Sequence, residues 1–158
     1  MRFALPFVLL ALLVSVARSS HGSTWKGKGK AMLNPTTGRP VSSWGPAAKL
    51  SHEEMLALAE KHGFVDPAKA AAIAMRESGG HPDALVDTVG MTDAQLHQFW
   101  GPKYARTKLL QECSSGLWQI NTLAFPQYDC EALKDPDFAA QAAFEISKGG
   151  TDWKAWGG

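Results

Sequence analysis

The sequence of 158 residues has few cysteines and almost no excess of charge of either sign. Two cysteines are too few for a disulfide-framework toxin or a zinc knuckle. A formal net charge of +1 argues against a dedicated nucleic-acid binder, so no nucleic-acid partner is expected. The length is that of one domain, and a hydrophobic content of 45% excludes a disordered scaffold.

Long hydrophobic runs are also absent, except at the N-terminus, where Arg2 precedes an apolar stretch over 3–17. Small residues follow in the arrangement of a cleavage site, so residues 1–19 are predicted to be a secretory signal peptide. An uncleaved membrane anchor is the alternative. The stretch is shorter than the roughly 20 residues that a spanning helix needs, and it carries Pro6. We therefore expect a secreted protein that has no membrane contact after cleavage.

Secretion decides how the two cysteines are interpreted. In an oxidising compartment an isolated pair is most simply one disulfide, so Cys113 and Cys130 are predicted to be bonded to each other. A catalytic thiol is the alternative, but no histidine lies close by in the sequence to activate it.

Residues 20–48 are rich in Gly, Pro, Ser and Thr and poor in apolar side chains. Such a composition buries too little apolar surface to offset the entropy of the chain, so a flexible leader is expected here. Lys26, Lys28 and Lys30 could touch an anionic polymer such as bacterial wall, although a solvated linker is the simpler interpretation. The candidate folded domain is 49–158.

Strand-forming residues are scarce in this domain, which holds six Val plus Ile against 17 Ala. Because alanine is the best helix former, 49–158 is predicted to be a single, mainly α domain. At most a small β-hairpin is expected, near 116–121.

Capping signals predict where the helices begin. A capping box over 51–54 predicts a helix that ends near Gly63, and Asp-Pro pairs at 66–67 and 135–136 predict two more. In the last of these helices, Phe138, Ala142 and Ile146 recur at helical spacing. A further helix is expected from 92 or 93 through 110, broken at 101–102.

One carboxylate lies on the apolar stripe of the helix predicted over 67–77. The stripe has the spacing i, i+3, i+4 and i+7 and consists of Ala70, Ile73, Ala74 and Glu77. Burial and the negative end of a helix both favour the protonated form of a carboxyl group, which suits a general acid. The alternative is a structural glutamate that ends its helix in solvent or pairs with Arg76 or a distant lysine.

Residues 114–121 (SSGLWQIN) combine small residues, a tryptophan and two amides in eight positions. Aromatic faces and amides suit sugars, which present apolar CH faces and many hydroxyl groups. The alternative is a turn followed by a core segment, in which Leu117 and Ile120 are buried and the amides are structural.

Together these segments resemble a known family. Residues 74–82 (AMRESGGHP) resemble the Glu-Ser-Gly segment of soluble lytic transglycosylases and related lysozymes. Residues 116–121 (GLWQIN) resemble the Gly-Leu-Met-Gln-Ile segment of those transglycosylases and the Gly-x-x-Gln-Ile-Asn segment of animal c-type lysozymes. The Asp-Pro pair at 135–136, with the later Trp153 and Trp156, resembles the last helix and the Trp-x-x-Trp close of lysozyme-like domains.

This resemblance implies a lysozyme-like α+β domain that cleaves the β-1,4 bond between N-acetylmuramic acid and N-acetylglucosamine in peptidoglycan. It makes Glu77 the catalytic acid. No cofactor is expected, and no metal, because the sequence has neither EF-hand nor zincin spacing. We expect a monomer that acts on glycan strands. The sugar cleft would be lined by Ser114, Gly116, Trp118, Gln119 and Asn121, with Tyr128 as a further candidate.

The sequence departs from the family pattern at the second carboxylate. Ser114 stands where c-type lysozymes carry an aspartate, which fits single-glutamate lytic transglycosylases, whose substrate supplies its own 6-hydroxyl as nucleophile. Nearby acids could still activate a water molecule, so hydrolysis and transglycosylation both stay open. The candidates for that role are Asp83, Asp87 and Glu112.

Two further departures concern spacing and a missing tyrosine. Glu77 and Ser114 are 37 positions apart, so residues 88–111 are interpreted as an inserted helical segment. This segment could border the sugar cleft, with Trp100 or Tyr104 stacked on a sugar ring. The simpler interpretation is a surface segment that takes no part in binding. The Ala-Tyr-Asn motif of many bacterial transglycosylases is missing, and residues 143–145 (AFE) stand in its region.

Other functions stay open beside the enzyme. A lysozyme-like fold can lose its chemistry and keep its cleft, so a non-catalytic glycan-binding protein is the alternative. A structural or adhesive secreted protein that uses the Lys-Gly leader is a third possibility.

Overall fold

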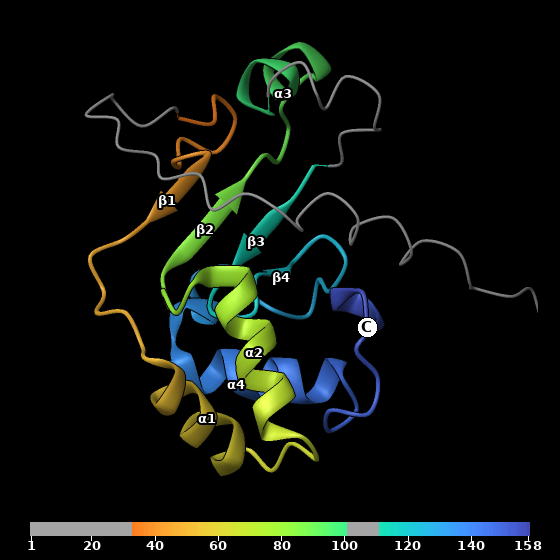
Figure 1. The fold of residues 1–158 in the computed structure, drawn as a ribbon. Coiled ribbons are helices and arrows are strands. Elements are labelled where there is room, and N and C mark those ends of the chain that lie inside the picture. The colour runs from red at the N-terminus through yellow and green to blue at the C-terminus, as the bar shows by residue number, and fades with distance from the viewer. Residues whose placement is uncertain (1–32, 101–110) are drawn as a thin grey trace, which may run out of the picture.

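The computed structural model describes residues 33–100 and 111–158, and within them the fold is mainly helical with one small sheet (Figure 1). The predicted signal peptide, the lysines of the leader and residues 101–110 with Tyr104 lie outside the described residues. The helices are α1 (His52–Lys61), α2 (Pro67–Ser78), α3 (Asp93–Trp100) and α4 (Pro136–Ile146), with 3-10 turns η2 (Ala132–Lys134) and η3 (Lys154–Trp156). The strands are β1 (Ser42–Trp44), β2 (Ala84–Asp87), β3 (Cys113–Ser115) and β4 (Ile120–Asn121).

The predicted helix caps are confirmed. Ser51 caps α1, since its Oγ accepts from the backbone N–H of Glu54 and the Glu54 carboxylate accepts from the backbone N–H of Ser51. The hydrogen bond from the backbone N–H of Ser51 to the carboxylate lowers the pKa of Glu54. Asp66 and Asp135 cap α2 and α4 with their side chains alone, which accept from the backbone N–H groups of Lys69 and Phe138, and each stands one residue before a proline.

The buried face of α4 differs from the prediction. Phe138 is 40% exposed, and its ring meets the ring of Tyr128 edge-on at 6.2 Å between centroids. The face that enters the core consists of small residues, namely Ala139, Ala140, Ala142 and Ala143. Ala142 is buried and Ile146 packs against the core as predicted, so of the three predicted residues only Phe138 lies outside the buried face.

The sheet is larger than the single hairpin expected near 116–121. Four antiparallel strands lie in the order β1-β2-β3-β4, as Figure 1 shows. The helices α1, α2 and α4 gather at one end of the sheet, and α3 lies at the other. The strands are two to four residues long and contain few β-branched residues, which is why the composition did not predict them.

The segment before Lys49 also differs from the flexible leader expected over 20–48. Residues 42–44 form β1, and Val41 is fully buried beside Leu96 of α3. Asn34 is fully buried as well, and its Nδ2 donates to Asp87 Oδ1 at 3.1 Å. The folded part of the chain therefore begins no later than Leu33. The composition of 20–48 did not predict this folded segment. Only two buried side chains and one short strand fix residues 33–44 to the domain, too few to change the average composition.

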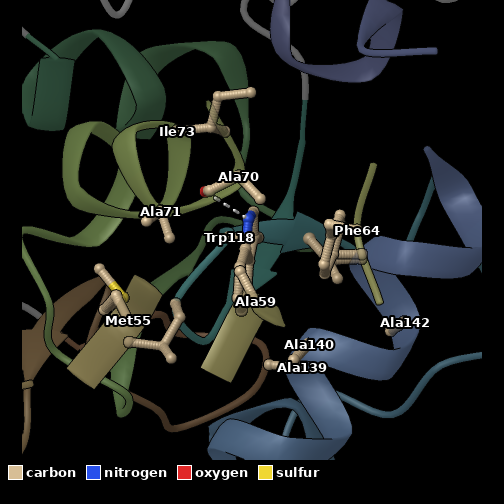
Figure 2. Packing of buried hydrophobic residues seen from close by; sticks show 14 of the residues in the cluster. Met55, Ala59, Phe64, Ala70, Ala71, Ile73, Trp118, Ala139, Ala140 and Ala142 are labelled. Carbon is tan, nitrogen blue, oxygen red and sulfur yellow. Dashed lines mark hydrogen bonds between the residues drawn. The ribbon is translucent and has the colours of Figure 1, made fainter. Parts of the chain in front are cut away.

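The main core lies between α1, α2, α4 and the C-terminal segment. Trp118 is at its centre and is fully buried (Figure 2). The ring of Phe64 is stacked with Trp118 at 6.1 Å and with Trp153 at 5.8 Å between centroids. No helix among the described residues is long and apolar enough to cross a membrane.

Candidate active site

Glu77 lies in the last turn of α2, and its side chain is only 5% exposed. The other members of the predicted stripe, Ala70, Ile73 and Ala74, are buried in the core, so the helix presents the face that the sequence indicated. Directly after it, Gly79 takes the left-handed conformation (φ 64°) that ends the helix. The carboxylate is thus held at the end of a rigid helix and at the edge of the core.

Arg76 pairs with Glu77. Its Nε and Nη2 donate to Glu77 Oε1 at 3.1 and 2.9 Å, and Nη2 also donates to the carbonyl oxygen of Trp156 at 2.7 Å. The structural alternative considered for Glu77, a pair with Arg76, is therefore present. The Arg76 guanidinium fixes the position of Glu77 Oε1, and it is itself bonded to the C-terminal segment at Trp156.

The segment 116–119 forms the turn between β3 and β4. The N–H of Gly116 donates to the carbonyl oxygen of Ala84 at 2.9 Å, and a Cβ at Gly116 would collide with the carbonyl oxygen of Leu133. Gly116 has a φ of 76°, which also favours glycine. The position therefore requires glycine for backbone packing, not for contact with a sugar.

The two amides of the segment make local contacts. Gln119 Nε2 donates to the carbonyl oxygens of Ala84 and Gly116 at 2.9 and 3.1 Å, and Gln119 is 7% exposed. Asn121 is half-buried, and its Oδ1 accepts from the N–H of Leu123 at 2.9 Å. These bonds match the interpretation in which the amides are structural. Asn121, the more exposed of the two, keeps the better access to a ligand.

Trp118 does not lie in an open cleft. It is fully buried, and its Nε1 donates to the carbonyl oxygen of Ala70 in α2 at 3.2 Å (Figure 2). The expectation that its ring faces sugar is wrong for this structure, because the ring fills the centre of the core. The interpretation of 116–121 as a turn and core segment, with Leu117 and Ile120 buried, is confirmed.

Trp118 nevertheless connects the two predicted motifs. Trp156 Nε1 donates to the carbonyl oxygen of Trp118 at 2.8 Å, and the carbonyl oxygen of Trp156 accepts from Arg76. A continuous set of hydrogen bonds therefore runs from Glu77 through Arg76, Trp156 and Trp118 back to Ala70 of α2. These hydrogen bonds fix the position of the end of α2 relative to the turn at 116–119.

Ser114 lies in the middle of the sheet. It pairs in register with Val86 and with Asn121, and Val86 pairs with Ser42, so these four side chains share one face. Ser114 is fully buried, and its Oγ donates to Glu112 Oε2 at 2.7 Å. Among the three acids considered for water activation, Glu112 is the one bonded to Ser114.

The other two acids lie elsewhere. Asp87 pairs in register with Cys113, so its side chain is on the sheet face opposite to Ser114. Asp83 precedes β2, and its Oδ2 accepts from the N–H of Ala47 at 2.9 Å. Glu112 is therefore the candidate second carboxylate on the Ser114 face.

Tyr128 is half-buried, and its hydroxyl donates to Glu145 Oε2 at 2.7 Å. Burial, together with the hydrogen bond and the negative charge of Glu145, raises the pKa of Tyr128 to about 12. The hydroxyl is thus a neutral donor that holds a carboxylate of α4.

The predicted disulfide is confirmed, since Cys113 and Cys130 are bonded and no free cysteine remains among the described residues. A catalytic thiol is thereby excluded, and the bond is compatible with an extracellular location. In residues 33–100 and 111–158, no group of three or more His, Cys, Asp or Glu side chains is placed to hold a metal ion.

The described part of the insertion, residues 88–100 and 111, includes α3. Leu96 of α3 packs with Val41 and Met91 in a small cluster beyond β1. The helix α3 therefore packs against the segment that contains Val41, directly before β1.

Comparison with known families adds to this geometry. The family model described as "Lysozyme like domain" matches residues 56–158, about two thirds of the chain. The chain belongs to this family. No curated protein and no solved structure matches it. The lysozyme-like domain, from within α1 to the last residue, contains both Glu77 and the turn at 116–119, whereas β1 and Asn34 precede it. Membership associates the chain with glycosidase chemistry on peptidoglycan.

Sequence reasoning missed two parts of this lysozyme-like site. The Trp156 carbonyl that anchors Arg76 is a backbone atom, so no residue type in the sequence could reveal it. The bond between Ser114 and Glu112 joins the middle of β3 to the residue directly before that strand. The composition did not indicate β3, so this bond could not be expected from the sequence.

Proposed function

We propose that this lysozyme-like protein is a secreted enzyme that cleaves the β-1,4 bond between N-acetylmuramic acid and N-acetylglucosamine, with Glu77 as general acid. The observation that carries the proposal is the placement of Glu77: a carboxylate with a side chain 5% exposed, at the end of α2, tied to the turn at 116–119 through Arg76 and Trp156. A general acid needs this kind of fixed geometry.

In the reaction Glu77 protonates the glycosidic oxygen as the bond to the anomeric carbon breaks and an oxocarbenium-like state develops. The two hydrogen bonds from Arg76 to Oε1 fix the orientation of the carboxyl group during this step. The resulting carboxylate then accepts a proton from the attacking hydroxyl group, which restores the acid.

The nucleophile distinguishes two outcomes. With a serine at 114, the 6-hydroxyl of the muramic acid residue attacks and gives a 1,6-anhydro end. If instead Glu112, bonded to Ser114, activates a water molecule, the product carries a reducing end. Both outcomes use the same acid.

The test is to incubate the mature protein and Glu77→Gln with purified peptidoglycan and to identify the released muropeptides by mass spectrometry. The substitution removes the proton and keeps the shape, so we expect product to fall by at least about 100-fold, the contribution of a general acid. Glu60→Gln, an exposed glutamate of α1, is the matched control and should cleave normally. Anhydro ends identify a transglycosylase and reducing ends a lysozyme.

A second candidate function is a non-catalytic lysozyme-like protein that binds glycan strands. It is favoured by Ser114, which leaves the centre of the sheet without the carboxylate that retaining glycosidases need. If the natural sequence releases no more product than Glu77→Gln, yet both sediment with peptidoglycan, this function replaces the enzyme.

A further inference from the structure

The ion pair between Arg76 and Glu77 joins two successive residues of one helix. Successive residues of an α-helix point about 100° apart, so their side chains do not face each other. The side chain of Arg76 is 51% exposed, whereas that of Glu77 is 5% exposed. The guanidinium therefore bends back from the surface to reach the carboxylate. An ion pair with one exposed partner is weak by itself, so this arrangement needs a second anchor.

The second anchor is the C-terminal turn η3. Within residues 33–100 and 111–158, the only other hydrogen bond from the Arg76 side chain goes to the carbonyl oxygen of Trp156, at 2.7 Å. Trp156 is the last residue of η3, and the last carbonyl groups of a helix have no partner inside it. A cationic side chain is a favourable partner for such a group. The position of the guanidinium thus depends on where η3 lies.

The indole of Trp156 fixes η3 to the core. Its Nε1 donates to the carbonyl oxygen of Trp118 at 2.8 Å, and Trp156 is 7% exposed. Trp118 is fully buried and is bonded in turn to Ala70 of α2, the helix that carries Arg76 (Figure 2). One residue therefore makes both contacts: its N–H holds the core, and its carbonyl oxygen holds the guanidinium.

Trp153, three residues earlier, lacks this link. It is 4% exposed and belongs to the same core cluster, and its ring meets that of Trp156 edge-on at 5.5 Å between centroids. Its Nε1 is buried, yet it has no hydrogen-bond partner in the part of the chain that the structure describes. The two tryptophans share ring type and burial, and they differ in the hydrogen bond made by the indole.

We propose that Trp156 is a positioning residue for the candidate general acid: its carbonyl oxygen holds the Arg76 guanidinium against Glu77 Oε1. The inference rests on the proposed function as far as turnover is concerned. The contact from Trp156 through Arg76 to Glu77 can be measured without any cleavage, so the two can be tested separately.

The first measurement is the rate at which the Arg76 Nε–H proton exchanges with solvent, by NMR on the natural mature protein, Trp156→Phe and Trp153→Phe. Each variant keeps an aromatic ring, but only Trp156→Phe loses a hydrogen bond. This proton donates to Glu77 Oε1, so we expect it to be protected in the natural protein and in Trp153→Phe. It should exchange about tenfold faster in Trp156→Phe, the factor that corresponds to one lost hydrogen bond. Equal exchange in the two variants overturns the proposal.

The second measurement is turnover on peptidoglycan. In Trp156→Phe we expect kcat to fall about tenfold while KM changes little, because the acid is displaced and the contacts with substrate remain. Trp153→Phe should keep the kcat of the natural protein. A role of Trp156 in core packing alone lowers both kcat values alike, and that result contradicts the proposal.

Melting temperatures show whether each variant is folded. If Trp156→Phe does not fold, Asp152→Ala decides: this carboxylate is partly exposed, and its Oδ1 accepts from the N–H of Lys154 at the start of η3. Loss of that bond should also speed exchange at Arg76, and an unchanged rate overturns the proposal. Absence of cleavage by the natural protein refutes the proposed function, whereas the exchange rates still decide whether Trp156 holds Arg76.

Discussion

At Glu77, two nitrogen atoms of one guanidinium donate to a single carboxylate oxygen. The same Nη2 donates to the carbonyl oxygen of Trp156, so the position of the carboxylate depends on a segment 80 residues further along the chain. Under the proposed function Arg76 is therefore a positioning residue, which would act on the reaction through Glu77 without touching the substrate.

Replacing this guanidinium should impair turnover more than binding. In Arg76→Met we expect kcat on peptidoglycan to fall by roughly 10- to 100-fold, since small displacements of a catalytic group are costly, while KM changes little. Arg76→Lys, which keeps one donor, should retain more activity than Arg76→Met. Lys69→Met, at an exposed cation of the same helix, serves as control. A kcat equal to that of the natural protein in both Arg76 variants would refute the positioning role.

The hydroxyl of Tyr128 makes stability depend on pH in the alkaline range. Its pKa is raised to about 12 by burial and by Glu145, so the folded state favours the protonated phenol. This stabilisation is fully present below the ordinary pKa of about 10 and is lost as the pH rises from there to about 12.

The measurement is the free energy of unfolding of the natural protein minus that of Tyr128→Phe, as a function of pH. We expect a positive difference at pH 8, of about 1 kcal/mol for the lost hydrogen bond, that falls through the alkaline range. A difference that is constant between pH 8 and pH 12 speaks against the raised pKa.

The turn between β3 and β4 depends on the absence of a side chain at Gly116. A Cβ there would meet the carbonyl oxygen of Leu133, whereas Gly63 has nearly the same φ (77° against 76°) and nothing within 4 Å of its Cβ position. The two glycines therefore separate the cost of the left-handed conformation from the cost of the collision.

Gly63→Ala should lower the free energy of unfolding by about 1 kcal/mol, the cost of a left-handed alanine. Gly116→Ala should lower it by about 3 kcal/mol or more, because backbone strain and overpacking add. Urea denaturation of the two variants and the natural protein gives both values. Equal losses would mean that η2 moves aside and that the turn is not tightly packed.

The elements that the sequence predicted well are those set by local chemistry. The caps at Ser51, Asp66 and Asp135 are complete within three residues of each helix start, so they are visible in the sequence. The sheet is made of short pairings between distant segments, and the burial of Trp118 depends on a carbonyl oxygen 48 positions earlier. No local pattern carries such information, which is why Glu77 was placed well and Trp118 was not.

At the scale of the whole molecule, the Cys113–Cys130 disulfide fastens the sheet to the segment before α4. It closes a loop of 17 positions, and in the chain-entropy model such a loop stabilises the folded state by about 3 kcal/mol. Complete reduction, checked by thiol titration, should therefore lower the melting temperature clearly. If the reduced protein melts at the same temperature as the oxidised one, the loop contributes no stability.

The strand β1 matters for any shortened form of the protein that begins at the lysozyme-like match. The lysozyme-like match begins at residue 56, after β1 and Asn34, although both pack on β2. A fragment that started at the match would leave β2 as an open edge, with backbone N–H and C=O groups exposed and the carboxylate of Asp87 without its amide partner. Exposed strand edges pair with other chains, so we expect such a fragment to self-associate. In the natural protein, residues 33–48 cover the edge of β2 and so oppose this pairing.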